Sequence, residues 1–292
     1  MKTLILLFAA LLATPLHADE LLRGVDRQPI TREALLAELR QAEYVLLGER
    51  HDNPQHHDAR AALLRELRGD VVVEHLDQGM RLDAALPLEQ ALKEAGYSFK
   101  AWRWPMQQTL FESLRQSGKT VLGGNLSRAD GWEVAMRGTA AVVPALATHI
   151  AAAPLAASAQ SRLDASLLAG HCGQLAAERL PNMRLAQRAR DAAMAHALLS
   201  TTKPVALLAG NGHVRLDYGV PSLLRVLAPG ARVLTVGFVE TDEVRNVAAD
   251  ETAYDYLWVT PTLARPDPCA NMRMPSRGPV AELGSPAPER GR

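Results

Sequence analysis

The sequence predicts an α/β protein in which a mostly parallel central sheet is flanked by helices. Five short apolar runs have the length and composition of buried strands. Stretches with helical spacing separate the first of these runs, and crossovers of this kind make neighbouring strands parallel. Glycine, histidine and carboxylate residues directly follow several of the runs. Because parallel strands end at the same edge of a sheet, we expect these residues to meet there.

The first predicted helix covers residues 31–41, where Thr31 is a suitable N-cap. The first core strand, residues 44–47, is followed by a charged stretch and then by Asn53-Pro54, a cap residue and a proline suited to the first helical turn. The helix that begins there extends to Arg68, since alanine and leucine recur at helical spacing. The other predicted strands are residues 70–73, 120–122, 205–209 and 233–239, and residues 21–30 hold at most a short entry strand.

The segment between the second and fourth predicted strands, about residues 82–201, is much longer than a simple connection. It is alanine-rich and predicted to be helical apart from the strand at residues 120–122. We expect a helical insertion or lid over the strand ends. Gln187 and Arg190 lie near one helical face together with Met183 and Met194, although the two methionines equally suit a core.

The two ends of the chain are expected to lie outside the fold. Residues 1–18 have the pattern of a secretory signal peptide, with Lys2, an apolar core over residues 4–13 and Ala18 before the cut. This predicts a periplasmic or secreted protein, and not a lipoprotein, since no cysteine is near the cleavage site. No later stretch has the length and apolarity of a membrane helix. Residues 19–265 are predicted to form one domain, and residues 266–292 a disordered tail.

Composition narrows the class of protein further. The chain is 48% hydrophobic, which is enough for a sizeable core, and its formal net charge is +0. It has no basic tract with interleaved aromatic residues, so we expect no nucleic-acid partner. Cys172 and Cys269 are the two cysteines, and in an oxidising compartment they can form one disulfide. Two unpaired, half-buried thiols are the alternative.

Four residues at the predicted strand ends carry the most chemistry: Glu49, His51, Glu74 and His213. A glycine precedes each of these two histidines by three positions and lets the backbone turn tightly after a strand. Mixed sets of histidine and carboxylate bind zinc, manganese or iron with room for water, so His51, Glu74 and His213 are predicted metal ligands. Without a metal, a histidine base and a carboxylate could orient a nucleophilic water, and the four residues would be catalytic in either case. A polar loop before a capped helix is the alternative.

Other histidines and aromatic residues allow two interpretations each. His56 and His57 either extend the strand-end site or are solvated in the first turn of a helix. His149 and His196 are expected to be structural. Trp102 and Trp104 lie close together in a chain with 4 tryptophans, and they form either a packing corner or the flank of a planar ligand.

Five segments occur in this order along the chain: 47–54, 125–128, His171-Cys172, 187–195 and 210–213. Together they resemble the ChaN-like haem-binding uptake family, over roughly residues 46–261. That family belongs to a superfamily with the Tiki metalloproteases and erythromycin-esterase-like proteins. The family resemblance implies an α/β fold with a helical subdomain, haem binding and a role in haem or iron uptake. The superfamily resemblance implies a metal or hydrolytic site at Glu49, His51, Glu74 and His213.

The same resemblance also implies which residues contact haem and which partners the protein has. It suggests a tyrosine ligand for haem, and Tyr97 beside the tryptophans is the candidate by environment. Trp102, Trp104, Arg128 and Asp191 complete the predicted cofactor-binding set. The predicted partners are haem, a second copy of the chain and an outer-membrane haem receptor. The leading hypothesis is therefore an exported haem-binding protein for haem or iron uptake, and the alternative is a metal-dependent hydrolase with a divalent metal.

Overall fold

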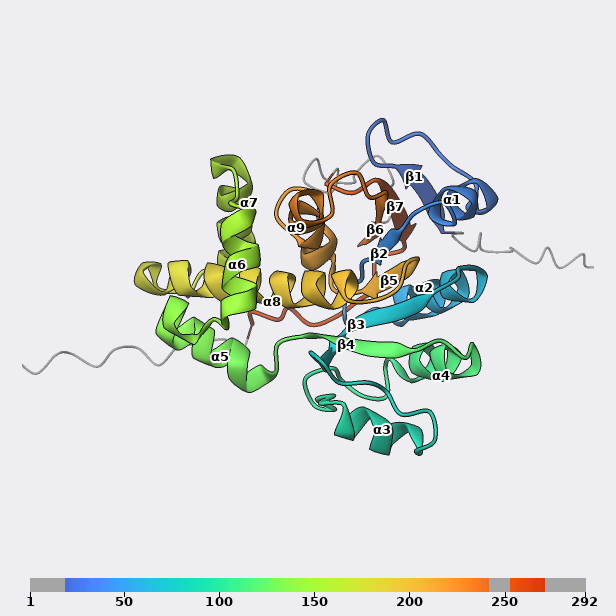
Figure 1. Cartoon of the computed structure of the whole chain (residues 1–292). Coiled ribbons are helices and arrows are strands. Elements are labelled where there is room, and N and C mark those ends of the chain that lie inside the picture. Colours follow the sequence, from blue (N-terminus) through green and yellow to red (C-terminus); the bar gives the residue numbers. More distant parts are fainter. Residues whose placement is uncertain (1–18, 242–252, 271–292) are drawn as a thin grey trace, which may run out of the picture.

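The computed structural model describes residues 19–241 and 253–270 (Figure 1). The predicted signal peptide and residues 271–292 of the predicted tail lie outside the described residues. The described chain forms a sheet of seven strands with helices on both faces. In chain order the strands are β1 (Glu20–Arg23), β2 (Tyr44–Leu47), β3 (Asp70–Asp77), β4 (Val121–Asn125), β5 (Val205–Leu208), β6 (Val233–Glu240) and β7 (Tyr256–Thr260).

The strands are arranged in the order β1-β7-β6-β2-β5-β3-β4. Every neighbouring pair is parallel except β1 with β7, so the predicted mostly parallel α/β sheet is confirmed. β2, whose four residues are all buried, lies in the middle between β6 and β5. The edge strand β1 is the short entry strand considered for residues 21–30, whereas its partner β7 was not predicted from the sequence. The carboxyl ends of β2, β5 and β3 therefore meet at one edge, as a parallel sheet requires.

Alternate side chains of the sheet face two different helical layers, as the two-residue period of a strand dictates. Val45 and Leu47 pack into one apolar core with the helices α1–α4, whereas Tyr44 and Leu46 pack into the other with α5, α6, α8 and α9. The helices are α1 (Arg32–Leu39), α2 (Pro54–Glu66), α3 (Leu88–Glu94), α4 (Gln108–Gln116), α5 (Arg128–Arg137), α6 (Pro144–Ala152), α7 (Ala157–Gly170), α8 (Leu180–Leu199) and α9 (Val220–Leu227).

The two helix starts expected from the sequence are present. The Thr31 side chain accepts a hydrogen bond from the backbone N–H of Ala34 at the start of α1. Asn53 does the same for the N–H of Gln55 at the start of α2, where Pro54 occupies the first turn. Each cap satisfies a backbone donor that the helix itself cannot pair. The cap at Asn53 fixes where α2 begins and thereby the length of the charged loop after β2.

The long segment between β3 and β5 is largely helical, as expected, and its helices α5, α6 and α7 pack on α8. Its helix α4 packs with α2 on one face of the sheet, and α8 packs on the other face. Only parts of it reach the strand ends: the loop that contains Trp102, the start of α5 and the middle of α8. In the described ranges no single helix is long and apolar enough to cross a membrane, although the bent pair Arg128–Ala141 and Pro144–Ala152 meets that test when counted together.

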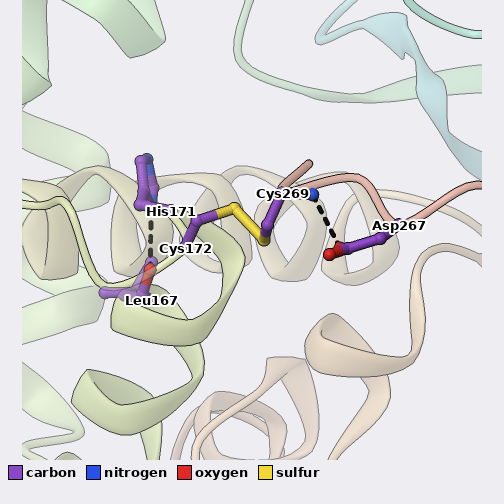
Figure 2. The surroundings of a disulfide bond; sticks show 5 residues. All are labelled: Leu167, His171, Cys172, Asp267 and Cys269. Carbon is purple, nitrogen blue, oxygen red and sulfur yellow. Dashed lines mark hydrogen bonds between the residues drawn. A yellow bond between two sulfur atoms is a disulfide. The ribbon is translucent and has the colours of Figure 1, made fainter. Parts of the chain in front are cut away.

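One disulfide joins the end of α7 to the chain beyond β7 (Figure 2). Cys172 and Cys269 are bonded across a sequence separation of 97 residues, which confirms the predicted pairing. Residues 266–270, the beginning of the predicted tail, are therefore attached to the helical layer.

The disulfide leads to a prediction about stability. Closing a loop of 97 residues contributes about 4–5 kcal/mol in the chain-entropy model, and less where the unfolded chain is compact. Thiol titration of denatured, unreduced protein should find no free thiol. Urea unfolding of Cys172→Ser/Cys269→Ser should show a lower free energy of unfolding than the parent. Two titratable thiols would contradict the pairing.

Candidate functional site

The structure brings Glu49, His51, Glu74 and His213 together at the carboxyl edge of the sheet. Glu49 and His51 follow β2, and His213 lies in a short 3-10 helix, Asn211–Val214, after β5. β3 continues to Asp77, so Glu74 and His75 lie within a strand and not after one, which corrects the predicted strand end. They still reach the edge, because β5 ends at Leu208, the partner of Val73. All four residues line a cleft of about 980 Å³, which we call the strand-end cleft.

Glu49 is the centre of a buried network of charged and polar groups. Its side chain is fully buried and forms an ion pair with the guanidinium of Arg60, an α2 residue with no exposed surface. Its Oε1 accepts hydrogen bonds from His51 Nδ1 at 2.6 Å and from His75 Nε2 at 3.1 Å. Burial, reinforced by the nearby Arg60, holds the pKa of His75 well below its usual value, so His75 is neutral. Arg60 was missed from the sequence, although it follows His57 by three positions, on the same face of α2.

A second chain of contacts joins Glu74 to α8. His213 Nε2 lies 3.4 Å from Glu74 Oε1, and His213 Nδ1 lies 2.6 Å from Asp191 Oδ1. Burial alone would lower the pKa of His213, but the two flanking carboxylates raise it to about 10. Burial opposes the charge of Glu74 as well, and His213 and His51 nevertheless hold the pKa of Glu74 well below its usual value. Glu74 also accepts a hydrogen bond from the N–H of Gly210 at 2.6 Å. At neutral pH Glu74 is therefore a carboxylate paired with a protonated His213. The other ring nitrogen of His213 bonds to Asp191, and burial raises the pKa of that carboxyl group.

The two glycines of the repeated pattern permit this close packing. A Cβ atom on Gly210 would lie 2.7 Å from His51 Nε2, and one on Gly48 would lie 2.2 Å from Asn211 Oδ1. At either position a Cβ atom would force the neighbouring side chain to move, so glycine lets the loops after β2 and β5 approach each other with His51 and Asn211 in their present positions. The spacing of glycine and histidine therefore reflects packing between the two loops.

His56 and His57 are buried and do not face the cleft. His56 Nδ1 accepts the backbone N–H of Arg50 at 3.0 Å, and its Nε2 donates to Thr260 Oγ1 at 3.0 Å. Burial lowers the pKa of His56 to about 3, and burial likewise lowers that of His57 to about 4. Both are neutral and hold the loop after β2 in place. His149 and His196 contact each other at 3.1 Å, between α6 and α8.

The predicted cofactor residues fall into three groups. Trp102 lines the strand-end cleft, with its ring 4.9 Å from that of His51 and 4.5 Å from that of His75. Tyr97 and Trp104 are outside the cleft lining: the Tyr97 hydroxyl donates to Gln107 at 2.8 Å, and the Trp104 indole donates to Glu89 at 3.0 Å. Tyr97 packs edge-on against Phe99, Trp104 and Phe111. The Asp191 carboxyl group pairs with His213, and Arg128 lines the cleft.

The structure regroups the predicted metal ligands. Glu49, His51 and His75 place one donor atom each within 4.8 Å of one another. The predicted ligand set was His51, Glu74 and His213. The structural set shares His51 with it and contains Glu49 and His75 in place of the other two residues. Carboxylate and imidazole donors suit zinc or iron. In the described structure, however, Glu49 Oε1 is already bonded to both histidines.

A second cavity of about 960 Å³ lies between α5, α7 and α8, and we call it the helical groove. It shares three lining residues with the strand-end cleft: Arg128, Gln187 and Arg190. Arg179 and His171 line it as well. Its other walls are largely apolar and include Trp132, Ala135, Leu167, Leu175, Met183 and Ala186. The sequence did not predict this cavity, although His171 lies in one of the segments that carried the family resemblance.

Comparison with known proteins connects this geometry to a family. Residues 35–224, more than half of the chain, match the model of a family described as haem-binding uptake, Tiki superfamily, ChaN. The chain belongs to the ChaN family. The resemblance expected from the sequence is thereby confirmed. Comparison with curated proteins gives no match.

A solved structure of a ChaN protein has the same fold as this chain. ChaN of Campylobacter jejuni, in a structure with cofacially bound haem, aligns with a TM-score of 0.68 and 20% identity, over 82% of this chain and 96% of that one. The MARTX toxin effector domain RRSP of Vibrio vulnificus aligns with a TM-score of 0.40 and 14% identity, over 79% of this chain and 37% of that one. At these identities the first match supports the α/β fold.

The Glu49–Arg60 pair predicts a non-additive stability effect. Arg60→Met leaves a buried carboxylate without its cation and should lower the free energy of unfolding by about 3–5 kcal/mol. Adding Glu49→Gln should recover part of that loss, and urea unfolding of both single variants and the double variant measures the coupling. The exposed pair of Arg40 and Glu66 at 2.9 Å is the control, where Arg40→Met should cost about 1 kcal/mol or less. Additive losses at Glu49 and Arg60 would contradict the pairing.

His56 predicts a dependence of stability on pH. Its pKa of about 3 in the folded protein lies below the ordinary histidine value of 6.5, so the unfolded chain binds a proton at a higher pH than the folded chain does. Stability should therefore fall as pH decreases from 6.5, by about 3 kcal/mol at pH 4 from this residue. In His56→Gln the loss between pH 6.5 and pH 4 should be smaller, as measured by urea unfolding at each pH. An unchanged acid dependence in this variant would contradict a buried, neutral His56.

Proposed function

We propose that this protein binds haem in the helical groove and serves in haem or iron uptake after export. The observation that carries the proposal is the chemistry of the groove in a chain of the ChaN family. Haem is a planar apolar macrocycle with two propionate groups. The groove combines apolar walls with three arginines, Arg128, Arg179 and Arg190, and its volume of about 960 Å³ lies in the range of ligand sites.

Different groove residues would contact the ring and the propionates of haem. Trp132, 62% exposed on α5, and Met183 on α8 offer apolar surface for the faces of the ring. Arginine guanidinium groups pair well with carboxylates, so the three arginines would hold the propionates. Bound haem would supply an iron atom, which a side chain of the groove could bind.

The strand-end cleft fits haem less well. Its lining contains the carboxylates of Glu49, Asp52, Glu74 and Asp77 beside four arginines, whereas the groove lining contains arginines and no carboxylate. An apolar ring over the cleft would cover Asp52 and Asp77, which are partly exposed, and removing their water without replacing it costs free energy. Tyr97, the ligand suggested by the resemblance, is buried behind this cleft with its hydroxyl bonded to Gln107. These contacts support the groove rather than the cleft.

The proposal also covers where the protein is located and what it interacts with. The proposed periplasmic or secreted location rests on the sequence of residues 1–18. A homodimer and an outer-membrane haem receptor stay predictions from the resemblance.

The hydrolase alternative relies on the histidines and carboxylates of the cleft, and the family match does not favour it. A divalent metal at Glu49, His51 and His75 is compatible with haem in the groove, because the groove lining contains none of the three.

Haemin titration tests the proposed function. Purified mature protein should give a saturable shift of the Soret band. Ala129→Trp fills the groove from an exposed position on α5 and should weaken binding, whereas Ala151→Trp, at an exposed position on α6 outside the groove lining, should not. His51→Ala/His213→Ala should bind as the parent does, since both residues lie in the cleft. A shift without saturation in the parent, or binding lost only in the histidine double variant, would contradict the proposal.

A further inference from the structure

His171 is the histidine of the helical groove, and its hydrogen bonding is one-sided (Figure 2). It is the C-cap residue of α7, directly after Gly170, and its Nδ1 lies 2.7 Å from the backbone carbonyl oxygen of Leu167. A carbonyl oxygen can only accept, so Nδ1 carries the proton and donates it. The neutral ring therefore has its lone pair on Nε2.

That lone pair is available. Within residues 19–241 and 253–270, no hydrogen bond or ion pair to His171 Nε2 is found. A histidine whose Nδ1–H is bonded to a backbone carbonyl is the usual arrangement for binding a metal through Nε2, because that bond sets the tautomer and orients the ring. The groove histidine thus has the hydrogen-bond pattern of a metal ligand, in surroundings that are mostly apolar.

The backbone beneath His171 is held from several directions. The next residue, Cys172, has the positive φ of 56°, and its N–H donates to the Ala169 carbonyl at 2.9 Å. Cys172 is also tied to Cys269 by the disulfide (Figure 2). On the other side, α7 is fixed to α8 by Arg184, which forms two hydrogen bonds to Asp164 at 2.6 and 2.9 Å. These links limit the movement of His171 relative to the groove wall on α8.

The other described histidines near the two cavities are already engaged. His51 Nδ1 is bonded to Glu49, and its Nε2 is directed at Glu74, 4.0 Å away. His213 is paired with carboxylates at both ring nitrogens. His75 donates Nε2 to Glu49 in the core. A haem bound between apolar walls would meet none of them there, because none lines the helical groove.

We propose that His171 binds the haem iron through Nε2, with the Leu167 carbonyl and the Cys172–Cys269 disulfide positioning it. This inference rests on the proposed haem binding and adds the residue that holds the iron. Met183, which also lines the groove, is the competing ligand, since a thioether can bind haem iron too.

The test compares haemin binding and the ligand-field bands of the parent with those of His171→Ala, Met183→Leu and the control His196→Ala. His171→Ala should bind haemin about tenfold more weakly or worse and show altered bands. Added imidazole should restore the parent bands, since it can occupy the space left by the side chain. His171→Gln is a second variant of similar size, and circular dichroism verifies that each variant is folded. Met183→Leu and His196→Ala should keep the parent bands.

Each contrary result has a separate meaning. Saturable binding by His171→Ala with the affinity and bands of the parent would overturn His171 as the ligand and leave haem binding intact. Bands that change in Met183→Leu and not in His171→Ala would assign the iron to the thioether and overturn the inference. Failure of the parent itself to bind haemin saturably would overturn the proposed function, and this inference with it.

Discussion

The pairing of Glu49 with Arg60 is the interaction on which the carboxyl edge of the sheet depends. A carboxylate and a guanidinium without water around them are stable only together, because either charge alone would be buried and uncompensated. Glu49 follows the central strand β2, and Arg60 comes from α2, so the pair fixes the helix against the strand. The remaining acceptor positions of Glu49 then orient His51 and His75. The loop after β2 follows from this arrangement, including the buried positions of its other histidines.

This constraint also separates the two cavities by chemistry. The strand-end cleft is lined by many charged groups, among them Glu74, which faces His213. Behind the lining, His213 bonds to Asp191. The helical groove on the far side of Arg128, Gln187 and Arg190 has apolar walls and arginines at its lining. A charged or metal-assisted reaction would suit the first cavity, and a large apolar anion would suit the second. Family membership and groove chemistry together favour haem in the second.

Much of the fold could be predicted from the sequence because it is encoded locally. β2 has the predicted bounds, and Thr31 and Asn53 cap the starts of α1 and α2 as predicted. The meeting of Glu49, His51, Glu74 and His213 followed from parallel strands alone. β7 and the continuation of β3 to Asp77 depend on tertiary pairing that no local pattern reveals. Tyr97 was chosen for its aromatic neighbours, but those neighbours form a core, and composition does not distinguish a core from a ligand pocket. The helical groove is formed by three helices distant in sequence, so His171 could be recognised as a ligand candidate only in three dimensions.

The most direct test of this account is to locate the iron in crystals of the protein grown with haemin. Anomalous diffraction at the iron absorption edge identifies the metal position without reference to the protein model. We expect the anomalous peak in the helical groove, next to His171 and between the walls formed by Trp132 and Met183. A peak in the strand-end cleft beside His51 would contradict the division of the two cavities, and with it the proposed haem site.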